Sequence, residues 1–426
     1  MGDRISRRIV RWLLSRTRGG QITLIEDGET TIYGDPESKL QATIELNRSG
    51  FHRQLLRGST GLAESYADRV WECDDTVALI RIAAINMPAL DRLRDRFRGL
   101  LFPIQRFKRI GVRNTPNRSR SHIARHYDLG NDLFSLFLDS TMMYSCAYFE
   151  TPQATLEEAS IAKLRLVCDK LDLGPEDHLL EIGTGWGALA IFAAREYGCR
   201  VTTTTISAEQ LELASARVSL AGLEDRITLL ERDYRDLEGR FDKLVSIEMI
   251  EAVGWQYLDT FFEKCSELLE PDGLMLLQAI TIDDRAYEGE KESKSFINTE
   301  IFPGGCLPSL EVMARCTAQR TDLSMVGLHD ITAHYSETLL RWRKNFLGRT
   351  EQAEGLGYDE RFRRMWDFYL AYCEAGFRER RIGDVQLLLA KPLWRDPLAP
   401  AELASVSLDP VADGPQAAVD AVENVA

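Results

Sequence analysis

At 426 residues, the chain is too long for one ordinary domain and fits two domains with tails. Its 44% apolar and 28% charged residues are typical of a globular protein, and no apolar run reaches the roughly 18 residues that a membrane-spanning helix needs. The eight cysteines are scattered, without a C-x-x-C pair. This spacing argues against a disulfide framework or a structural zinc site, and we expect a cytoplasmic protein with reduced thiols.

The net charge of −14 is unevenly distributed along the chain. Residues 1–125 carry 23 Lys and Arg against 14 Asp and Glu, whereas residues 126–426 carry 29 against 52. The most basic stretch is 92–125, with eleven Lys and Arg against the single acid Asp95. A basic front on an acidic protein favours an anionic partner, either nucleic acid or phospholipid headgroups, over an accidental unevenness.

The N-terminal residues predict a small α+β domain that begins with an amphipathic helix. Residues 4–16 place apolar side chains on one helical face and arginines mostly on the other. The apolar side chains are Ile5, Ile9, Trp12 and Leu13, and the arginines are Arg4, Arg7, Arg8 and Arg11. Such a helix can lie on a membrane interface, or it can cap the domain through its apolar stripe. A β-hairpin around Asp27-Gly28 follows. We assign residues 1–105 to this membrane-associating domain and 106–125 to a basic linker.

A different pattern begins at His126. A helix-like, aromatic-rich segment and a compact loop, TMMYSCAYFE, precede a helix that opens with a capping box formed by Thr155 and Glu158. Strands and helices then alternate. The expected strands are HLLEIG, RVTTTTI, RITLLERD, FDKLVSI and LMLLQAITI, and the expected helices cover 187–196, 208–221 and 255–269. This alternation predicts a doubly wound parallel sheet.

Irregular segments complete the second domain, which we assign to residues 126–393. Residues 283–312, with the motif FPGG, interrupt the alternation, and we interpret them as a lid. Helices at SETLLRWRKNFLGR and 360–381 precede a final strand, QLLLAKP. Residues 394–426 are rich in Ala, Pro and Asp, and we predict that they are disordered.

A glycine-rich loop follows the first strand of the second domain. LLEIGTGWGALA places Gly183, Gly185 and Gly187 between a buried strand and a helix, where backbone amides can approach a ligand. The spacing G-x-G-x-G weakens a dinucleotide interpretation. Glu181 before the first glycine suits a cationic or amino-acid-bearing ligand better than a pyrophosphate. The loop matches the first motif of class I S-adenosylmethionine methyltransferases.

The end of the second strand departs from that pattern. Most such folds place an acidic residue there to bind the ribose hydroxyls. Here the segment TTTTISAEQ has no carboxylate before Glu209. We therefore expect the neutral side chains of Thr205 and Gln210 to contact the ribose instead.

Six segments, in this order, closely resemble cyclopropane-fatty-acid synthases and the related mycolic-acid cyclopropane synthases and methyltransferases. They are HYDLGNDLFSLFLDSTMMYSCAYFE, LLEIGTGWGALA, TTTTISAEQ, SIEMIEAVG, IFPGG and HYSETLLRW. The resemblance covers about residues 120–392, and YSCAYFE and IFPGG are specific to that family. It implies a class I methyltransferase fold of α/β/α layers. It also implies transfer of the S-adenosylmethionine methyl to the double bond of unsaturated phospholipid acyl chains, forming cyclopropane fatty acids.

The resemblance further implies how the reaction ends. Attack of the alkene on the sulfonium methyl leaves a carbocation, and ring closure requires a base small enough for an apolar pocket. In this family the base is a bound bicarbonate. By resemblance, Cys146 and Ile280 contribute backbone contacts, Glu251 hydrogen-bonds the bicarbonate and Tyr335 closes the site. Gln278 stands where family members carry histidine; it can donate a hydrogen bond but cannot carry charge.

The resemblance also assigns contacts to S-adenosylmethionine. Tyr144 and Ser145 match positions that touch its methionine part. Gly183 and Gly185 match positions near its amino acid and ribose, and Tyr234 matches the position beside the adenine. Aromatic faces near a sulfonium also stabilise it electrostatically.

We expect the protein to act peripherally on the inner face of the plasma membrane, as a homodimer. Two alternatives stay open. The same first step can end in a methylene- or methyl-branched fatty acid, or the chain can be a catalytically silent lipid-binding protein, against which Cys146, Glu251 and Tyr335 argue. A nucleic-acid methyltransferase would also explain the basic front. The sequence lacks an N/D-P-P-Y tetrapeptide, however, and we expect no nucleic-acid partner.

Overall fold

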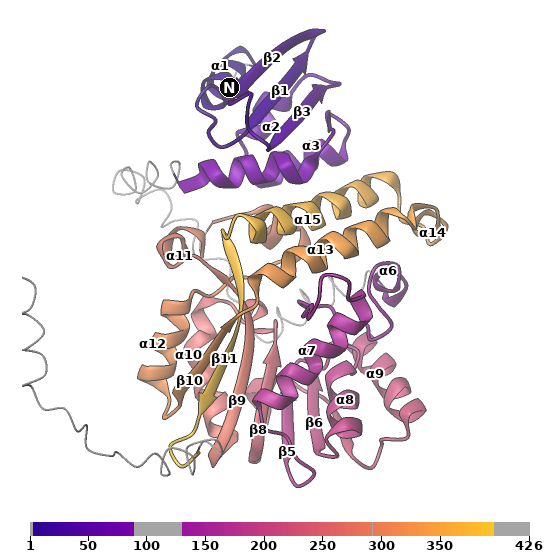
Figure 1. Cartoon of the computed structure of the whole chain (residues 1–426), viewed down its shortest axis with the longest axis vertical. Helices are drawn as coiled ribbons and strands as arrows, with labels where there is room; N and C mark the ends of the chain where they lie inside the picture. Colours follow the sequence, from indigo (N-terminus) through magenta and orange to yellow (C-terminus); the bar gives the residue numbers. More distant parts are fainter. Residues whose placement is uncertain (1–2, 89–129, 292, 396–426) are drawn as a thin grey trace, which may run out of the picture.

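The computed structural model describes residues 3–88, 130–291 and 293–395. Figure 1 shows a small N-terminal domain next to a larger α/β domain. Helices α13 (Thr332–Leu347) and α15 (Glu360–Arg378) lie between the small domain and the large sheet. The whole basic stretch 92–125, which includes the predicted linker 106–125, and the tail 396–426 lie outside the described residues. The domain boundaries at 105 and 125 therefore stay predictions.

The N-terminal domain is a four-stranded sheet in the order β2-β1-β3-β4, packed with helices. Its elements are α1 (Asp3–Leu14), β1 (Gln21–Glu26), β2 (Glu29–Gly34), β3 (Gln41–Leu46), α2 (Phe51–Leu55), α3 (Ser59–Ala67) and β4 (Trp71–Cys73). The predicted hairpin is confirmed, with β1 and β2 antiparallel and Glu26 opposite Glu29. Asp27 and Gly28 between them have φ of 56° and 79°, the positive values that a two-residue turn needs to match the strand twist.

The large domain is built on a seven-stranded sheet in the order β10-β11-β9-β8-β5-β6-β7. Its strands are β5 (His178–Ile182), β6 (Arg200–Thr205), β7 (Ile227–Glu231), β8 (Phe241–Ile247), β9 (Leu269–Ile282), β10 (Ser324–Asp330) and β11 (Ile382–Ala390). The parallel sheet predicted from the strand–helix alternation is confirmed for β5 to β9, whereas β11, whose direction the sequence did not predict, runs antiparallel to both β9 and β10. The sequence analysis also missed β10, an edge strand whose alternation is broken by a register shift between Met325 and Gly327.

Helices cover both faces of the large sheet and give three α/β/α layers (Figure 1). One face carries α7 (Leu156–Lys170), α8 (Ala188–Glu196) and α9 (Ala208–Ala221), and the other carries α10 (Leu258–Glu267) and α12 (Leu310–Arg320). The predicted capping box at the start of α7 is present. The Thr155 side chain accepts a hydrogen bond from the Glu158 backbone, and the Glu158 carboxylate accepts one from the Thr155 backbone.

Two helix predictions need correction. The helix expected over 255–269 is a 3₁₀ turn (Trp255–Tyr257) followed by α10, because β9 already begins at Leu269. The helix-like segment after His126 contains, within the described residues, only the short helix α6 (Asn131–Ser135).

The segment interpreted as a lid makes hydrogen bonds to both domains. Its helical parts are α11 (Asp284–Glu290) and a π-helical turn (Ile297–Ile301). The Phe296 backbone donates to Ser59 Oγ of the small domain at 3.0 Å. The Cys306 backbone donates to the Glu251 carbonyl at 2.8 Å. A lid function for 283–312 stays a prediction.

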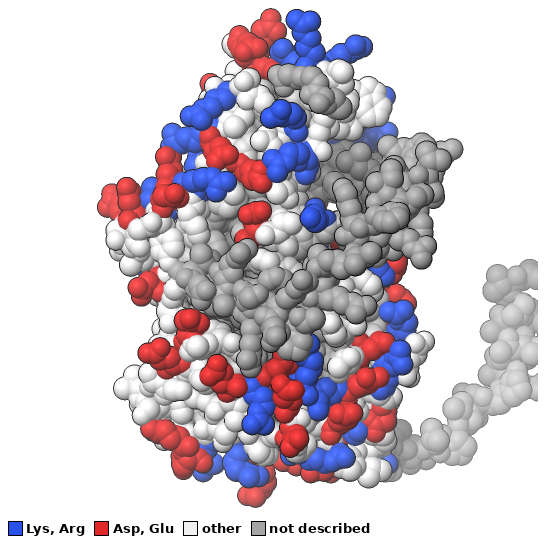
Figure 2. Space-filling view, turned by 180° about the vertical axis from the view of Figure 1, so that it is seen from behind, with Lys and Arg blue, Asp and Glu red and all other residues white. Residues whose placement is uncertain are grey.

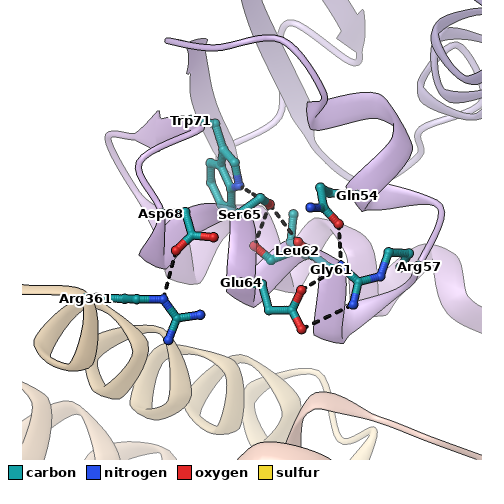
Figure 3. Close-up of polar contacts among 9 residues, drawn as sticks. All are labelled: Gln54, Arg57, Gly61, Leu62, Glu64, Ser65, Asp68, Trp71 and Arg361. Carbon is teal, nitrogen blue, oxygen red and sulfur yellow. Dashed lines mark hydrogen bonds and ion pairs between the residues drawn. The ribbon is translucent and has the colours of Figure 1, made fainter. Parts of the chain in front are cut away.

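The small domain contacts α15 through a polar network that is buried at its centre and exposed at its edge. At the centre, the Tyr66 hydroxyl donates to Asp367 Oδ2 at 3.1 Å, and Arg343 Nε donates to Asp367 Oδ1 at 2.6 Å. Figure 3 shows the edge, where Arg361 Nε donates to Asp68 Oδ1 at 2.8 Å. Both of these edge side chains are about half exposed, at 56% and 47%. The domains are therefore fixed to one another by an interface whose buried and exposed contacts differ in strength.

Helix α1 contacts the N-terminal domain through the side opposite to the predicted apolar stripe. Val10 is fully buried, and Arg7 and Arg11 reach the Glu26 carboxylate at 2.8 and 2.9 Å. The exposed side carries Ile5, Ile9 and Trp12. The prediction that the stripe caps the domain is therefore wrong for these three residues. Among the helices that the structure describes, none is long and apolar enough to span a membrane.

We predict that Tyr66→Phe lowers the free energy of unfolding by about 1–3 kcal/mol, because it removes a buried hydrogen bond to a charged carboxylate. Arg361→Ala, the matched control at the exposed edge, should cost less than about 1 kcal/mol. Urea unfolding of both variants measures the difference. Equal losses would mean that burial does not distinguish the two contacts.

Candidate functional site

The glycine loop after β5 has the backbone geometry of a ligand-binding turn. Gly183, Gly185 and Gly187 have φ of 107°, 51° and 83°, values that residues with a side chain rarely adopt. A Cβ at Gly187 would lie 3.3 Å from the Ala214 Cβ, whereas a Cβ at Gly185 would meet no atom within 4 Å. The loop therefore leaves space at Gly185, beside the N-terminus of α8, where backbone N–H groups can meet a ligand.

A buried acid and a buried base lie beside this loop. Glu181, at the end of β5, accepts a hydrogen bond from Thr203 Oγ1 at 2.6 Å, and burial raises its pKa to about 8. Lys163 of α7 is fully buried and donates to Ser145 Oγ at 2.9 Å, and burial lowers its pKa to about 8. The predicted cofactor residues Glu181 and Ser145 thus both lie near the Lys163 ammonium. This pairing of charges suits a ligand that carries both an amino and a carboxylate group.

The other predicted cofactor residues lie at the carboxyl ends of the neighbouring strands. Thr205 Oγ1 at the end of β6 donates to Gln210 Oε1 at 2.9 Å, and both side chains are buried. Tyr234, after β7, packs edge-on against Phe261 with ring centroids 5.5 Å apart. Ligands of open α/β sheets bind at this edge. The contacts to ribose and adenine stay predictions.

The YSCAYFE loop lies against α13 and α15. The Tyr144 hydroxyl is 2.7 Å from the Tyr369 hydroxyl, and its ring lies 5.3 Å from the Trp342 ring and 5.0 Å from the Phe134 ring. Cys146 is fully buried, and burial raises the pKa of its thiol well above the usual value. The side chain therefore stays a neutral thiol, and the backbone N–H is its polar group toward the site.

A carboxylate that the sequence analysis did not select, Glu248, joins three of the predicted catalytic residues. Its Oε1 accepts hydrogen bonds from the Cys146 backbone N–H and from Gln278 Nε2, each at 2.8 Å. Its Oε2 accepts one from the Tyr335 hydroxyl at 2.6 Å. Glu248 follows β8 directly and has φ of 49°, an unfavourable conformation for a residue with a side chain. The contacts that hold it there come from a loop, a strand and a helix.

Glu251, the carboxylate that the resemblance selected, lies one turn further on. Its Oε1 accepts the Ile280 backbone N–H at 2.5 Å. Its Oε2 is buried and has no hydrogen-bond partner among the described residues. Burial and the charge of Glu248 raise the pKa of Glu251 to about 8. The predicted catalytic residues Cys146 and Tyr335 therefore meet at Glu248, and Glu251 holds Ile280.

A second buried acid, Asp384 of β11, completes the cluster. Gln278 Nε2 donates to Asp384 Oδ2 at 3.0 Å, and Gln278 Oε1 accepts from Gln386 Nε2 at 3.0 Å. Burial and then the charge of Glu248 raise the pKa of Asp384 well above its usual value. Burial also raises the pKa of Glu248, but Tyr335 and other hydrogen-bond donors oppose this rise. The proton of the pair therefore resides on Asp384 and the negative charge on Glu248.

The residues expected to hold a bicarbonate are assembled, but their hydrogen-bond donors are already engaged. Three of them contact the Glu248 carboxylate, and the fourth, the Ile280 N–H, contacts Glu251. A second anion would have to displace Glu248 and lie beside two acidic side chains. The arrangement therefore does not fit a bound bicarbonate.

Sequence reasoning could have found part of what it missed. Glu248 lies in SIEMIEAVG, three residues before Glu251, and also follows a buried strand. Lys163 breaks the apolar face of a strongly capped helix, and Asp384 precedes the apolar run VQLLLA. Each is a charged residue at a position that the pattern buries, and such groups need partners. Which partners they meet depends on contacts between distant segments.

The chain matches the family model described as mycolic acid cyclopropane synthetase over residues 114–387. It is 40% identical over 375 residues to the tuberculostearic acid methyltransferase UfaA1 of Mycobacterium tuberculosis, with 86% of each chain covered. It is 39% identical over 347 residues to the cyclopropane-fatty-acyl-phospholipid synthase of Escherichia coli, with 80% of this chain and 85% of that protein covered.

Solved structures give the same result. The mycolic acid cyclopropane synthase CmaA1, complexed with SAH and CTAB, is 34% identical with a TM-score of 0.60, and the match covers 64% of this chain and 98% of that chain. The cyclopropane synthase MmaA2 from Mycobacterium tuberculosis is 31% identical with a TM-score of 0.60, and the match covers 66% of this chain and 100% of that chain. With the glycine loop, the acid cluster and the class I methyltransferase fold, these matches show that the chain belongs to the mycolic acid cyclopropane synthetase family of S-adenosylmethionine-dependent methyltransferases.

Proposed function

We propose that the protein transfers the methyl of S-adenosylmethionine to the double bond of an unsaturated phospholipid acyl chain and closes a cyclopropane ring. One observation carries this proposal: Cys146, Gln278 and Tyr335 all donate to the Glu248 carboxylate. Glu248 follows β8 and lies next to the glycine loop after β5. The name of the Escherichia coli relative, cyclopropane-fatty-acyl-phospholipid synthase, supports the same substrate and product.

The cofactor supplies a sulfonium methyl, an electrophile strong enough for a weakly nucleophilic alkene. The alkene π electrons would form a bond to that methyl while its bond to sulfur breaks, which would release S-adenosylhomocysteine and leave the positive charge on the neighbouring acyl carbon. Aromatic rings such as Tyr144 and Trp342 present faces that favour a cation, and the Glu251 carboxylate favours it further above its pKa of about 8. Ring closure then requires a base to remove a proton from the new methyl group.

A branched product is the second candidate. The relative from Mycobacterium tuberculosis is named a tuberculostearic acid methyltransferase rather than a cyclopropane synthase. From the same carbocation, a hydride shift followed by loss of a methyl proton gives a methylene branch with the same mass as the ring. A saturated methyl branch would need a separate reductant.

Transfer of label from methyl-labelled S-adenosylmethionine to lipid vesicles tests the function, and NMR of the product separates the ring from the methylene branch. The absence of transfer would support a catalytically silent lipid-binding protein.

We also propose that the protein works on the inner leaflet of the plasma membrane and that α1 contacts the lipid. Ile5, Ile9 and Trp12 are exposed, and the Arg16 guanidinium lies 3.7 Å from the Trp12 ring centroid. This combination of apolar and basic side chains is typical of interfacial helices. On the face of the molecule that Figure 2 shows, the Lys and Arg side chains are interspersed with Asp and Glu. The proposal therefore rests on the exposed apolar side chains of α1. A homodimer stays a prediction.

We predict that Gly185→Val abolishes S-adenosylmethionine binding. The branched side chain would fill the space beside α8 and disfavour the φ of 51°. Gly222→Val is the matched control, because Gly222 also has positive φ (66°) and an open surrounding but ends α9 away from the loop. Equilibrium dialysis of the folded variants measures the affinity. Retained binding in Gly185→Val would assign the loop another role.

We predict that at pH 9, above the pKa of about 8 of Glu251, Glu251→Gln lowers turnover by about 10²–10³-fold and leaves cofactor affinity unchanged, because it removes a negative charge that stabilises the carbocation. Glu267→Gln, which changes an exposed glutamate of α10, is the control and should have no effect. Single-turnover label transfer and calorimetric titration measure the two quantities. Near-normal turnover would remove Glu251 from the mechanism.

We predict that replacing Ile5, Ile9 and Trp12 together by serine lowers partitioning into vesicles by at least about 10-fold. Three apolar side chains that enter the interface together contribute more than the roughly 1.4 kcal/mol that a tenfold change requires. Ile32→Ser on β2, which removes another exposed apolar side chain of the same domain, is the control. Vesicle sedimentation measures the partitioning. Unchanged partitioning of the triple variant would exclude α1 from the membrane contact.

A further inference from the structure

We infer that the Glu248 side chain is the base that removes the proton from the methylated acyl chain, in place of a bound bicarbonate. This inference rests on the proposed function, because it names the residue that completes the proposed reaction. It extends the site by a residue that neither the resemblance nor the predicted catalytic set contains.

The first support is the hydrogen-bond geometry of the carboxylate. A carboxylate has about four lone-pair positions. Oε1 uses two of them, for the Cys146 N–H and Gln278 Nε2. Oε2 uses one, for the Tyr335 hydroxyl at 2.6 Å. The Asp384 side chain of β11 also hydrogen-bonds this carboxylate, so partners from four separate segments fix the orientation of Glu248.

The second support is the location of Glu248. The residue as a whole is half-buried, unlike the fully buried Gln278 beside it. The next residue, Met249, adjoins the glycine loop after β5, since a Cβ at Gly183 would lie 3.4 Å from the Met249 Cβ. The Cys146 N–H that holds Oε1 follows Ser145 in the chain, a predicted contact of the cofactor's methionine part. The carboxylate therefore lies between two segments that border the methyl donor.

The third support is the backbone. Glu248 has φ of 49°, and its own N–H donates to the Gln278 carbonyl at 2.9 Å. A side chain at positive φ costs about 1–3 kcal/mol and persists where surrounding contacts hold it, commonly at functional sites. Because glycine would remove this cost, the presence of glutamate needs a reason in the side chain itself.

The contacts around Glu248 favour its ionised form. The Lys163 ammonium and the three donors oppose the rise that burial causes in the pKa of Glu248. In the proposed step, a C–H bond of the new methyl breaks and the proton moves to Oε2 of Glu248. The released electron pair forms the second C–C bond of the ring and neutralises the carbocation. No other reactant is consumed, and Glu248 returns its proton to water after the product leaves.

Two variants test the inference. Glu248→Gln keeps the shape of the side chain but cannot accept the proton, and it should lose about 10²–10⁴-fold in turnover with cofactor affinity retained. Glu248→Gly relaxes the backbone and leaves a space lined by the Cys146, Gln278 and Tyr335 donors. Its turnover should be equally low and should recover on addition of formate or bicarbonate. Glu248→Gln should not recover, because the amide still fills that space.

The wild-type enzyme provides the remaining comparison. Its turnover should be the same in buffer freed of bicarbonate and in buffer to which bicarbonate is added. Loss of wild-type activity without bicarbonate, turnover of Glu248→Gln within a few-fold of wild type, or loss of its cofactor binding would each overturn the inference. If the wild-type enzyme transfers no methyl to any lipid, the proposed function itself fails, and that result is distinguishable from all of these.

Discussion

The structure of the site depends on satisfying one buried negative charge. Leaving an ionised carboxylate without partners inside a protein is too costly, so the Glu248 carboxylate has to be met by donors from other segments. It receives them from the loop that contains Cys146, from β9 through Gln278 and from α13 through Tyr335. These three elements are far apart in the sequence, and the carboxylate is the point that all of them share. The same need explains why Gln278 is held in turn by Gln386.

Glutamine at 278 and glutamate at 248 make sense together. A histidine at 278 could carry a charge and help to hold a free anion, whereas glutamine offers only a neutral N–H. When the anion is a side chain, it cannot dissociate, and a neutral donor is enough to orient it. With Glu248 as the proposed base, the site needs no dissolved ion, and the base is present before the substrate arrives.

Sequence reasoning predicted the parts of this structure that local pattern determines. The glycine loop, the strand–helix alternation, the hairpin at Asp27-Gly28 and the capping box of α7 are all set by residues close to one another in the chain. Strand β10 was missed because a bulge hides its alternation, and the direction of β11 was not predicted because it leaves no mark in its composition. Glu248 and Asp384 were missed because a charge at a buried position shows that it needs a partner but not which one. The resemblance selected Glu251, which accepts the Ile280 N–H beside this cluster and whose catalytic role stays a prediction, but the contacts of Glu248 come only from the folded chain.

Helix α13 carries both Tyr335, which holds the Glu248 carboxylate, and Arg343, which holds Asp367 at the contact with the small domain. Eight residues of α-helix separate them by about 12 Å along the axis. A helix of this length is stiff, so α13 links the Glu248 site, through Tyr335, to the domain interface, through Arg343. Tyr66 of the small domain contacts the same Asp367. One helix therefore joins the contact with the small domain to the hydrogen bond that Tyr335 donates to Glu248.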